Sequence, residues 1–415
     1  MTLSPVFTLD RNSRLRISVF IFMLVSMAIS QLASSRYIGY PIWEHLLSNQ
    51  GIFDDFYGAR DENPNDYYLQ SPVYGTNPPG TLMLGRLYAL FPDRAAIVVA
   101  AVGWALLSAW AVGLIAKRYS AIWFLAVSYP FWFAILRGND DIYLLPGILL
   151  LAWSLENNKP EIFGVVVGLL ALAEPYSLLF TIPLVFTGYI KQAVIPAVLV
   201  LGGWLSTSAF GARDLGLYLR LAEDSPKTYL RNMAFGDGGM LFGNSMFGLL
   251  KWISQNLNGL SAEETVEFSK DLYGWYLPVA WAIIAVVIVV TALRDTTVYS
   301  FLLRLALLTC LLPPVVATYK LGILLGLLIY RLYRLEIGSK RDTFETWLLV
   351  LIIIPKPYII TYLPSGALTT LESLLNPILM LLLLMMTMTQ GQLSTTNRIA
   401  ESPVKKFRQF RSGAV

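Results

Sequence analysis

The sequence predicts an all-α integral membrane protein that crosses the bilayer about 12 times. Of its 415 residues, 56% are hydrophobic and only 14% are charged, whereas a soluble protein carries about 25% charged residues. The mean hydropathy is +0.58. The apolar residues also fall into long runs that approach the roughly 20 residues a helix needs to cross the hydrocarbon core. We expect one transmembrane domain over 1–390 and a basic tail over 391–415.

Twelve apolar segments are the expected membrane spans, within about two of that number. They lie near 15–34, 95–116, 120–136, 142–156, 162–175, 177–190, 192–210, 275–293, 297–313, 319–334, 344–363 and 373–389. Because Pro146, Pro175 and Pro183 interrupt three of them, these segments are expected to be kinked, or re-entrant where protein covers them. The first is expected to be an uncleaved helix rather than a signal peptide, since many spans follow it.

The basic residues of the short loops predict the orientation, because such loops carry Lys and Arg on the cytoplasmic side. An even number of spans places both termini on that side. Two long segments, about 36–94 and 211–274, then lie outside the cytoplasm with the short turns 137–141, 314–320 and 364–372. The basic residues concerned are Arg11, Arg14, Arg16, Lys117, Arg118, Lys159, Lys191, Arg294, Arg331, Arg334, Lys340 and Arg341. We expect the bacterial plasma membrane as the location.

Charge and cysteine content exclude several classes of function. The net charge of +4 comes without the basic stripe on a soluble face that a nucleic-acid partner needs. One cysteine, Cys310, and one histidine, His45, exclude a zinc site of the usual His/Cys kind. No cofactor or metal site is therefore predicted, although carboxylates leave a bound divalent cation open.

The first long outer segment offers two candidate catalytic carboxylates. "GIFDDFYGAR" at 51–60 places Asp54 beside Asp55 just after the first span. A general base needs a carboxylate held near an acceptor hydroxyl, with a pKa set by burial and neighbouring charges. A solvated pair of loop carboxylates is the alternative interpretation.

The outer turn "RGNDD" at 137–141 gathers a cation, an amide and two carboxylates at the membrane edge. Arg137 could hold a phosphate in a bidentate contact. Asp140 and Asp141 begin the next helix, where acidic residues are favoured by the helix dipole alone. Both interpretations stay open from the sequence.

Other ionisable residues interrupt apolar runs, where they are costly unless paired. Glu174 is expected to pair with a basic residue on a neighbouring helix or to lie closer to the membrane surface, and a structural pair with Arg304 is the favoured interpretation. Lys320 and Lys356 lie at span ends, where either phosphate binding by Lys320 or snorkelling explains them. A separate segment, "NSMFGLLKWISQNL" at 244–257, is amphipathic and is expected to lie along the membrane surface.

A family resemblance follows from the order of these motifs. A first helix, an acidic loop, "YGTNPPG" at 74–80, "RGNDD", "GVVVGLLALAEPYSLL" at 164–179 and "PPVVATYKL" follow one another. This order resembles the GT-C superfamily of membrane glycosyltransferases, and most closely glycosyltransferase family 87. The likeness covers roughly 15–330. The chain departs from the family pattern where Glu174 stands in place of a frequent Lys. It also departs at Tyr319, where some members carry a histidine whose role cannot be carried over.

The resemblance implies a GT-C-like bundle with its active site on the non-cytoplasmic face. The donor would be a sugar linked to polyprenyl phosphate, and the acceptor a hydroxyl of a lipid or glycan. Asp55, or Asp54, would deprotonate that hydroxyl, and membrane lipids would surround the polyprenyl tail. The cations expected to stabilise the phosphate are Arg137, Lys320 and Arg60, and the further substrate contacts are Asn139, Tyr319, Tyr74 and Asn77.

Two other functions remain open. A transporter or lipid flippase would place ionisable residues at mid-membrane, for which Glu174 and Arg304 are the candidates, but the sequence lacks the paired halves of many transporters. A non-catalytic assembly subunit would leave Asp54 and Asp55 in bulk water.

Overall fold

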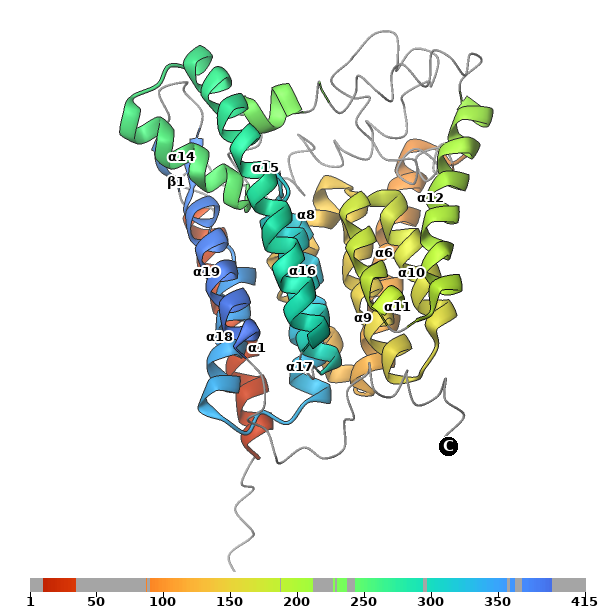
Figure 1. Ribbon diagram of the computed structural model, residues 1–415. Helices are drawn as coiled ribbons and strands as arrows, with labels where there is room; N and C mark the ends of the chain where they lie inside the picture. Colours follow the sequence, from red (N-terminus) through yellow and green to blue (C-terminus); the bar gives the residue numbers. More distant parts are fainter. Residues whose placement is uncertain are drawn as a thin grey trace, which may run out of the picture.

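A computed structural model gives the fold of most of the membrane domain (Figure 1). It describes residues 10–34, 87, 90–186, 188–211, 227, 230–236, 243–293, 297–356, 359–362 and 368–389. The predicted site residues of the first outer segment and the basic tail lie outside these ranges, namely Asp54, Asp55, Arg60, Tyr74, Asn77 and 391–415. Helices make up nearly all of the described chain, which confirms the all-α class.

Four described helices are long and apolar enough to cross a membrane. They are α1 (Arg11–Ser34), α6 (Asp93–Ala116), α15 (Ala262–Leu293) and α19 (Leu371–Met388). A fifth crossing exists if the helices on either side of a 64° bend, Tyr119–Ala126 and Tyr129–Arg137, count as one span. Large apolar side chains on α1, α6 and α15 face outward, as expected of helices in contact with lipid.

The predicted number of 12 spans is not confirmed. Further helices occupy the other expected segments, but several contain only 13 or 14 residues. At 1.5 Å per residue such a helix is about 20 Å long, which is shorter than the hydrocarbon core of about 30 Å. The helices are α9 (Leu144–Glu156), α10 (Pro160–Ala173), α16 (Val298–Leu311), α17 (Gly322–Arg334), α18 (Lys340–Ile353) and the longer α12 (Ile190–Gly211).

Some of these α-helices are short because a 3₁₀ turn occupies part of the expected apolar segment. Three 3₁₀ turns, η2 (Asp140–Tyr143), η3 (Pro175–Thr181) and η6 (Thr318–Leu321), lead into α9, α11 (Ile182–Phe186) and α17. Each puts polar residues where an uninterrupted span would be apolar. The remaining short helices are η1 (Tyr119–Ile122), α7 (Trp123–Ala126), α8 (Tyr129–Arg137), the π-helical η4 (Leu230–Phe235) and α14 (Met246–Asn258).

The expected span 344–363 is wrong in its second half. Helix α18 ends at Ile353, because Pro355 cannot continue the backbone hydrogen bonding of a helix. The chain then forms β1 (Ile359–Tyr362), which pairs antiparallel with β2 (Leu368–Thr370). The β-branched residues of β1 favour this extended conformation.

Glycines allow the buried helices to approach closely. A Cβ atom on Gly168 of α10 would lie 2.6 Å from Leu199 of α12, and one on Gly326 of α17 would lie 2.4 Å from Ile148 of α9. Gly164 precedes Gly168 by one helical turn, and Gly322 likewise precedes Gly326. Small residues at this spacing are typical of helix pairs inside membranes, where backbones pack without intervening side chains.

One end of the bundle, which we call the basic end, joins the starts of α1 and α18 to the ends of α17 and α19 (Figure 1). Arg11 donates to the carbonyl of Gly338, Arg16 donates to that of Leu332 at 2.7 Å, and Arg341 donates to Thr389 at 2.8 Å. The described first and last helices therefore begin and end at the same end. The compartment that it faces remains a prediction.

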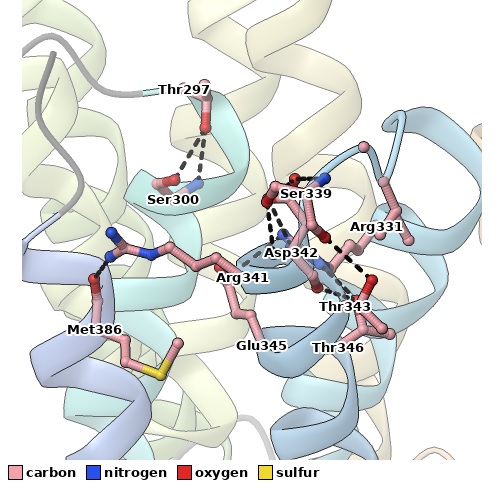
Figure 2. A network of polar contacts seen from close by, with 12 residues as sticks. Thr297, Ser300, Arg331, Ser339, Arg341, Asp342, Thr343, Glu345, Thr346 and Met386 are labelled. Carbon is pink, nitrogen blue, oxygen red and sulfur yellow. Dashed lines mark hydrogen bonds and ion pairs between the residues drawn. The ribbon is translucent and has the colours of Figure 1, made fainter. Parts of the chain in front are cut away.

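Figure 2 shows the polar network that closes the basic end. Arg331 on α17 donates to Glu345 at 3.2 Å, to Thr346 at 2.9 Å and to the carbonyl of Asp342 at 2.9 Å, all on α18. Ser339 and Asp342 form a capping box at the start of α18. Burial disfavours ionisation of Asp342, but hydrogen bonds from Ser339 and the charge of Arg331 outweigh it, so the pKa is lower than usual.

Candidate functional site

The opposite end of the bundle, which we call the turn end, carries η2, η3 and η6 and most of the described residues predicted to bind substrate. Arg137 is the last residue of α8, and Gly138, in the left-handed conformation with φ 65°, ends that helix. Asn139 follows and leads into η2. Tyr319 and Lys320 belong to η6. The fold thus brings these residues to one end of the bundle from two distant parts of the sequence.

The turn end contains an ion pair between Glu174 and Lys320. Their side chains are 10% and 14% exposed, so both charges are largely removed from water. The Glu174 carboxylate also accepts a hydrogen bond from the backbone N–H of Tyr176, 3.4 Å away, and so caps η3. The Tyr176 ring centroid lies 6.0 Å from the ammonium of Lys320, within reach of a cation–π contact.

This ion pair corrects the expected Glu174–Arg304 pair. Arg304 lies on α16 and donates to Thr291 on α15 at 3.1 Å and to the carbonyl of Thr387 on α19. Thr387 belongs to the last turn of α19, near the basic end. A neighbouring cation does pair with Glu174, as the cost of an isolated charge requires, but that cation is Lys320.

The residues of η2 have clear structural roles. The side chain of Asn139 accepts a hydrogen bond from the N–H of Asp141 at 2.9 Å and caps the turn. Asp140 and Asp141 occupy its first turn, and Asp141 is buried. The two aspartates therefore occupy the start of a helical turn, as the helix-start interpretation expects. Their position beside η6 still leaves them close to Lys320.

Tyr319 belongs to a stack of three aromatic rings. Its ring centroid lies 6.0 Å from that of Phe133 on α8, and Phe133 lies 5.6 Å from Tyr129. Offset stacks at these separations stabilise a structure beyond the area they bury. The stack fixes η6 against α8, so that Arg137 and Lys320 are held on neighbouring elements.

Sequence reasoning missed a buried chain of hydrogen bonds next to Lys320. Thr318 donates to Glu372 on α19 at 2.9 Å and accepts from Asn244 at 3.3 Å, and Asn376 donates to Asn244 at 2.5 Å. All four side chains are buried. Glu372 and Asn376 interrupt an apolar run just as Glu174 does, so the cost of polar groups in a membrane was the signal that could have found them.

Lys356, the other lysine considered at the outer end of a span, has a structural role. Its ammonium donates to the carbonyls of Leu351, Ile352 and Ile354 at 2.6, 3.2 and 2.8 Å. It therefore satisfies the last carbonyl groups of α18, where a cation is favoured by the helix dipole.

Within the described residues, no three His, Cys, Asp or Glu side chains lie close enough together to hold a metal ion. The turn end offers instead a lysine in an ion pair, an arginine on a neighbouring element, and exposed or half-buried tyrosines. Such side chains suit the binding of an anion that carries a polar substituent. No known family model, curated protein or solved structure matches the chain.

Proposed function

We propose that the protein is an integral membrane glycosyltransferase. It would transfer a sugar from a polyprenyl-phosphate-linked donor to a hydroxyl of a lipid or glycan acceptor, at the non-cytoplasmic face. The observation that carries the proposal is the convergence of Arg137, Asn139, Tyr319 and Lys320 at the turn end. The basic end, where cytoplasmic loops are expected, is opposite. The order of the sequence motifs supports the same function.

The charges of the turn end suit a phosphate leaving group. Arg137 can offer two parallel N–H donors to one phosphate, and Lys320 can offer a point charge. Because Glu174 already neutralises Lys320, a bound phosphate would have to share or displace that carboxylate. Polyprenyl phosphate leaves as a stable anion, so cations that stabilise developing charge suffice and a strong general acid is not needed.

The general base in this proposal is Asp55 or Asp54. The bond from the sugar's anomeric carbon to the donor phosphate breaks as the acceptor oxygen attacks, and the acceptor's proton passes to the carboxylate. Both aspartates lie in the segment that leads into α6, outside the described ranges, and their position relative to Arg137 remains a prediction.

Sugar transfer by the purified protein in lipid vesicles tests the proposal. Radiolabelled polyprenyl-phosphate sugars serve as donors, and lipid extracts serve as acceptors. We expect Asp55→Asn or Asp54→Asn to abolish product formation without unfolding the protein. The matched control is Asp271→Asn, which removes an exposed carboxylate of α15 and should retain activity. Full activity in both single variants and in the double variant would refute the mechanism.

The transporter alternative has less support. Its two candidate residues are near opposite ends of the bundle, since Glu174 pairs at the turn end and Arg304 bonds to the last turn of α19. A transport path would instead place ionisable groups near the middle of the membrane. The assembly-subunit alternative would be favoured by a folded protein that transfers no sugar with any donor.

A further inference from the structure

The turn end carries more carboxylates than cations. Its charges come from α8, η2, η6 and η3 with the residue that caps it. Among the described residues of these elements the cations are Arg137 and Lys320, and the carboxylates are Asp140, Asp141 and Glu174. Two cations and three carboxylates leave one net negative charge. A site that attracts a doubly charged phosphate would carry an excess of positive charge instead.

Two of these carboxylates lie close to Lys320. Asp141 is buried in η2, and Glu174 forms the ion pair. The thiol of Cys310 lies 3.8 Å from the carbonyl oxygen of Lys320. The charges of Lys320, Asp141 and Glu174 all act on this thiol, which places the three groups around one point. An anion that reaches Lys320 therefore meets two carboxylates in a region where charges interact more strongly than in water.

The Glu174 carboxylate is held in its position. It accepts a hydrogen bond from the N–H of Tyr176 at 3.4 Å, and Pro175 fixes the backbone between the two residues. Because the Glu174 side chain is only 10% exposed, dissolved salt screens its charge weakly. Tyr176 lies against the Lys320 ammonium and is 43% exposed, so the ion pair lies close to the protein surface.

The transfer proposed above changes the charge of the phosphate. The donor is a phosphodiester with one negative charge. When the bond from the anomeric carbon to the phosphate oxygen breaks, its electron pair stays on that oxygen. The acceptor oxygen forms the new bond to the anomeric carbon, and its proton passes to the general base. The product is a phosphate monoester, which carries about −1.5 to −2 charges at pH 7. A fixed carboxylate therefore repels the product more than the donor.

We propose that Glu174 is a specificity-determining residue. It makes the neighbourhood of Lys320 selective for a phosphodiester with one charge over a doubly charged monoester, and so promotes release of the polyprenyl phosphate product. This selectivity rests on the proposed function, because it requires a phosphate beside Lys320. A cationic site without such a carboxylate would prefer the doubly charged ligand.

Equilibrium binding of two short isoprenyl ligands tests this role without requiring turnover. The ligands are radiolabelled geranyl phosphate, a monoester, and geranyl methyl phosphate, a diester. At about pH 8 the monoester is doubly charged, because its second pKa is about 6. The proteins are the wild type, Glu174→Gln and Glu174→Asp in lipid nanodiscs. The matched control is Glu156→Gln, which removes a carboxylate from the ion pair with Arg334 at the basic end.

We expect the wild type to bind the diester about tenfold more tightly than the monoester, which corresponds to about 1.4 kcal/mol. Glu174→Gln should abolish this preference, because the doubly charged ligand loses twice the repulsion that the singly charged ligand loses. Glu174→Asp retains the charge and should retain the preference, as should Glu156→Gln.

The outcomes separate this role from the proposed function. A wild type that binds the monoester as tightly as the diester would overturn the role of Glu174 but leave phosphate binding intact, and this result is available even if Glu174→Gln is too unstable to purify. A preference that survives in folded Glu174→Gln would overturn it as well. If no folded variant binds either ligand saturably, both the role of Glu174 and the proposed phosphate site are wrong.

Discussion

The Glu174–Lys320 ion pair allows a quantitative prediction of how much the free energy of unfolding falls when the pair is broken. Glu174→Gln would leave the ammonium of Lys320 largely buried and without its carboxylate. Two unit charges about 4 Å apart attract each other by about 4 kcal/mol at an effective dielectric constant of about 20. Breaking a fully buried pair costs about 3–5 kcal/mol. Because both side chains retain slight exposure, we expect a loss of about 2–3 kcal/mol in the free energy of unfolding.

The two charges should be energetically coupled, which a double-mutant cycle measures. Lys320→Met alone should also destabilise the protein, because it leaves Glu174 buried without its cation. The double variant Glu174→Gln/Lys320→Met should recover most of the loss, because no buried charge then remains unpaired. We expect a coupling energy of about 2 kcal/mol from this double-mutant cycle.

The chain contains a built-in probe for this experiment. Cys310 is the only cysteine, it is buried, and its thiol lies 3.8 Å from the carbonyl oxygen of Lys320. A thiol-reactive fluorophore should therefore report unfolding as the detergent-solubilised protein is heated or titrated with dodecyl sulfate. If the double variant loses as much stability as the two single variants added together, the ion pair is not the source of the effect and the reasoning is refuted.

Three further predictions concern packing, acid stability and the buried hydrogen-bond chain. Gly326→Ala should cost about 1–3 kcal/mol because its Cβ would lie 2.4 Å from Ile148, whereas Gly103→Ala, which meets nothing within 4 Å, should be neutral in the same unfolding assay. The pKa of Asp342 is lowered in the folded protein, so its stabilising effect is complete above the unfolded value of about 3.9 and is lost as pH falls through the folded value. Asp342→Asn should flatten the acid limb of a stability–pH curve, and an unchanged limb would contradict the assignment. Thr318→Val should cost about 1–3 kcal/mol by leaving Asn244 and Glu372 without this partner. That is more than Thr309→Val should cost, since Thr309 donates to the carbonyl of Ala306 within its own helix and joins no other helix through that bond.

The positions of the helices follow largely from the sequence, while their lengths do not. Runs of apolar residues predicted α1, α6 and α19 within a few residues, because helices exposed to lipid must be apolar where they cross it. For α15 they predicted the end but not the start, since the helix begins at Ala262 with polar turns that precede the apolar run expected from 275. The interior helices α9 and α17 gave the same apolar signal. They are surrounded by protein, and burial in protein selects the same residues as burial in lipid, so hydropathy alone could not show that they are short.

The candidate site was predictable only in part, because the sequence shows which charges need a partner but not which partner each one meets. The cost of a charge inside an apolar run predicted that Glu174 needs a partner, but it favoured Arg304, and Lys320 was considered only for phosphate binding or snorkelling. The choice of partner depends on which helix ends meet, and the turns η3 and η6 determine it. The same argument applied to Glu372 and Asn376 would have led to their chain of hydrogen bonds with Thr318 and Asn244.

The contacts at the basic end have a practical consequence. Arg11 reaches the carbonyl of Gly338 and Arg341 reaches Thr389, so the first and last described residues flank the start of a single helix, α18. Two halves of a split fluorescent protein, joined at residues 10 and 389 of a chain shortened to the described range, would start from neighbouring points. Their reassembly in intact cells would report that these two points lie in the same compartment.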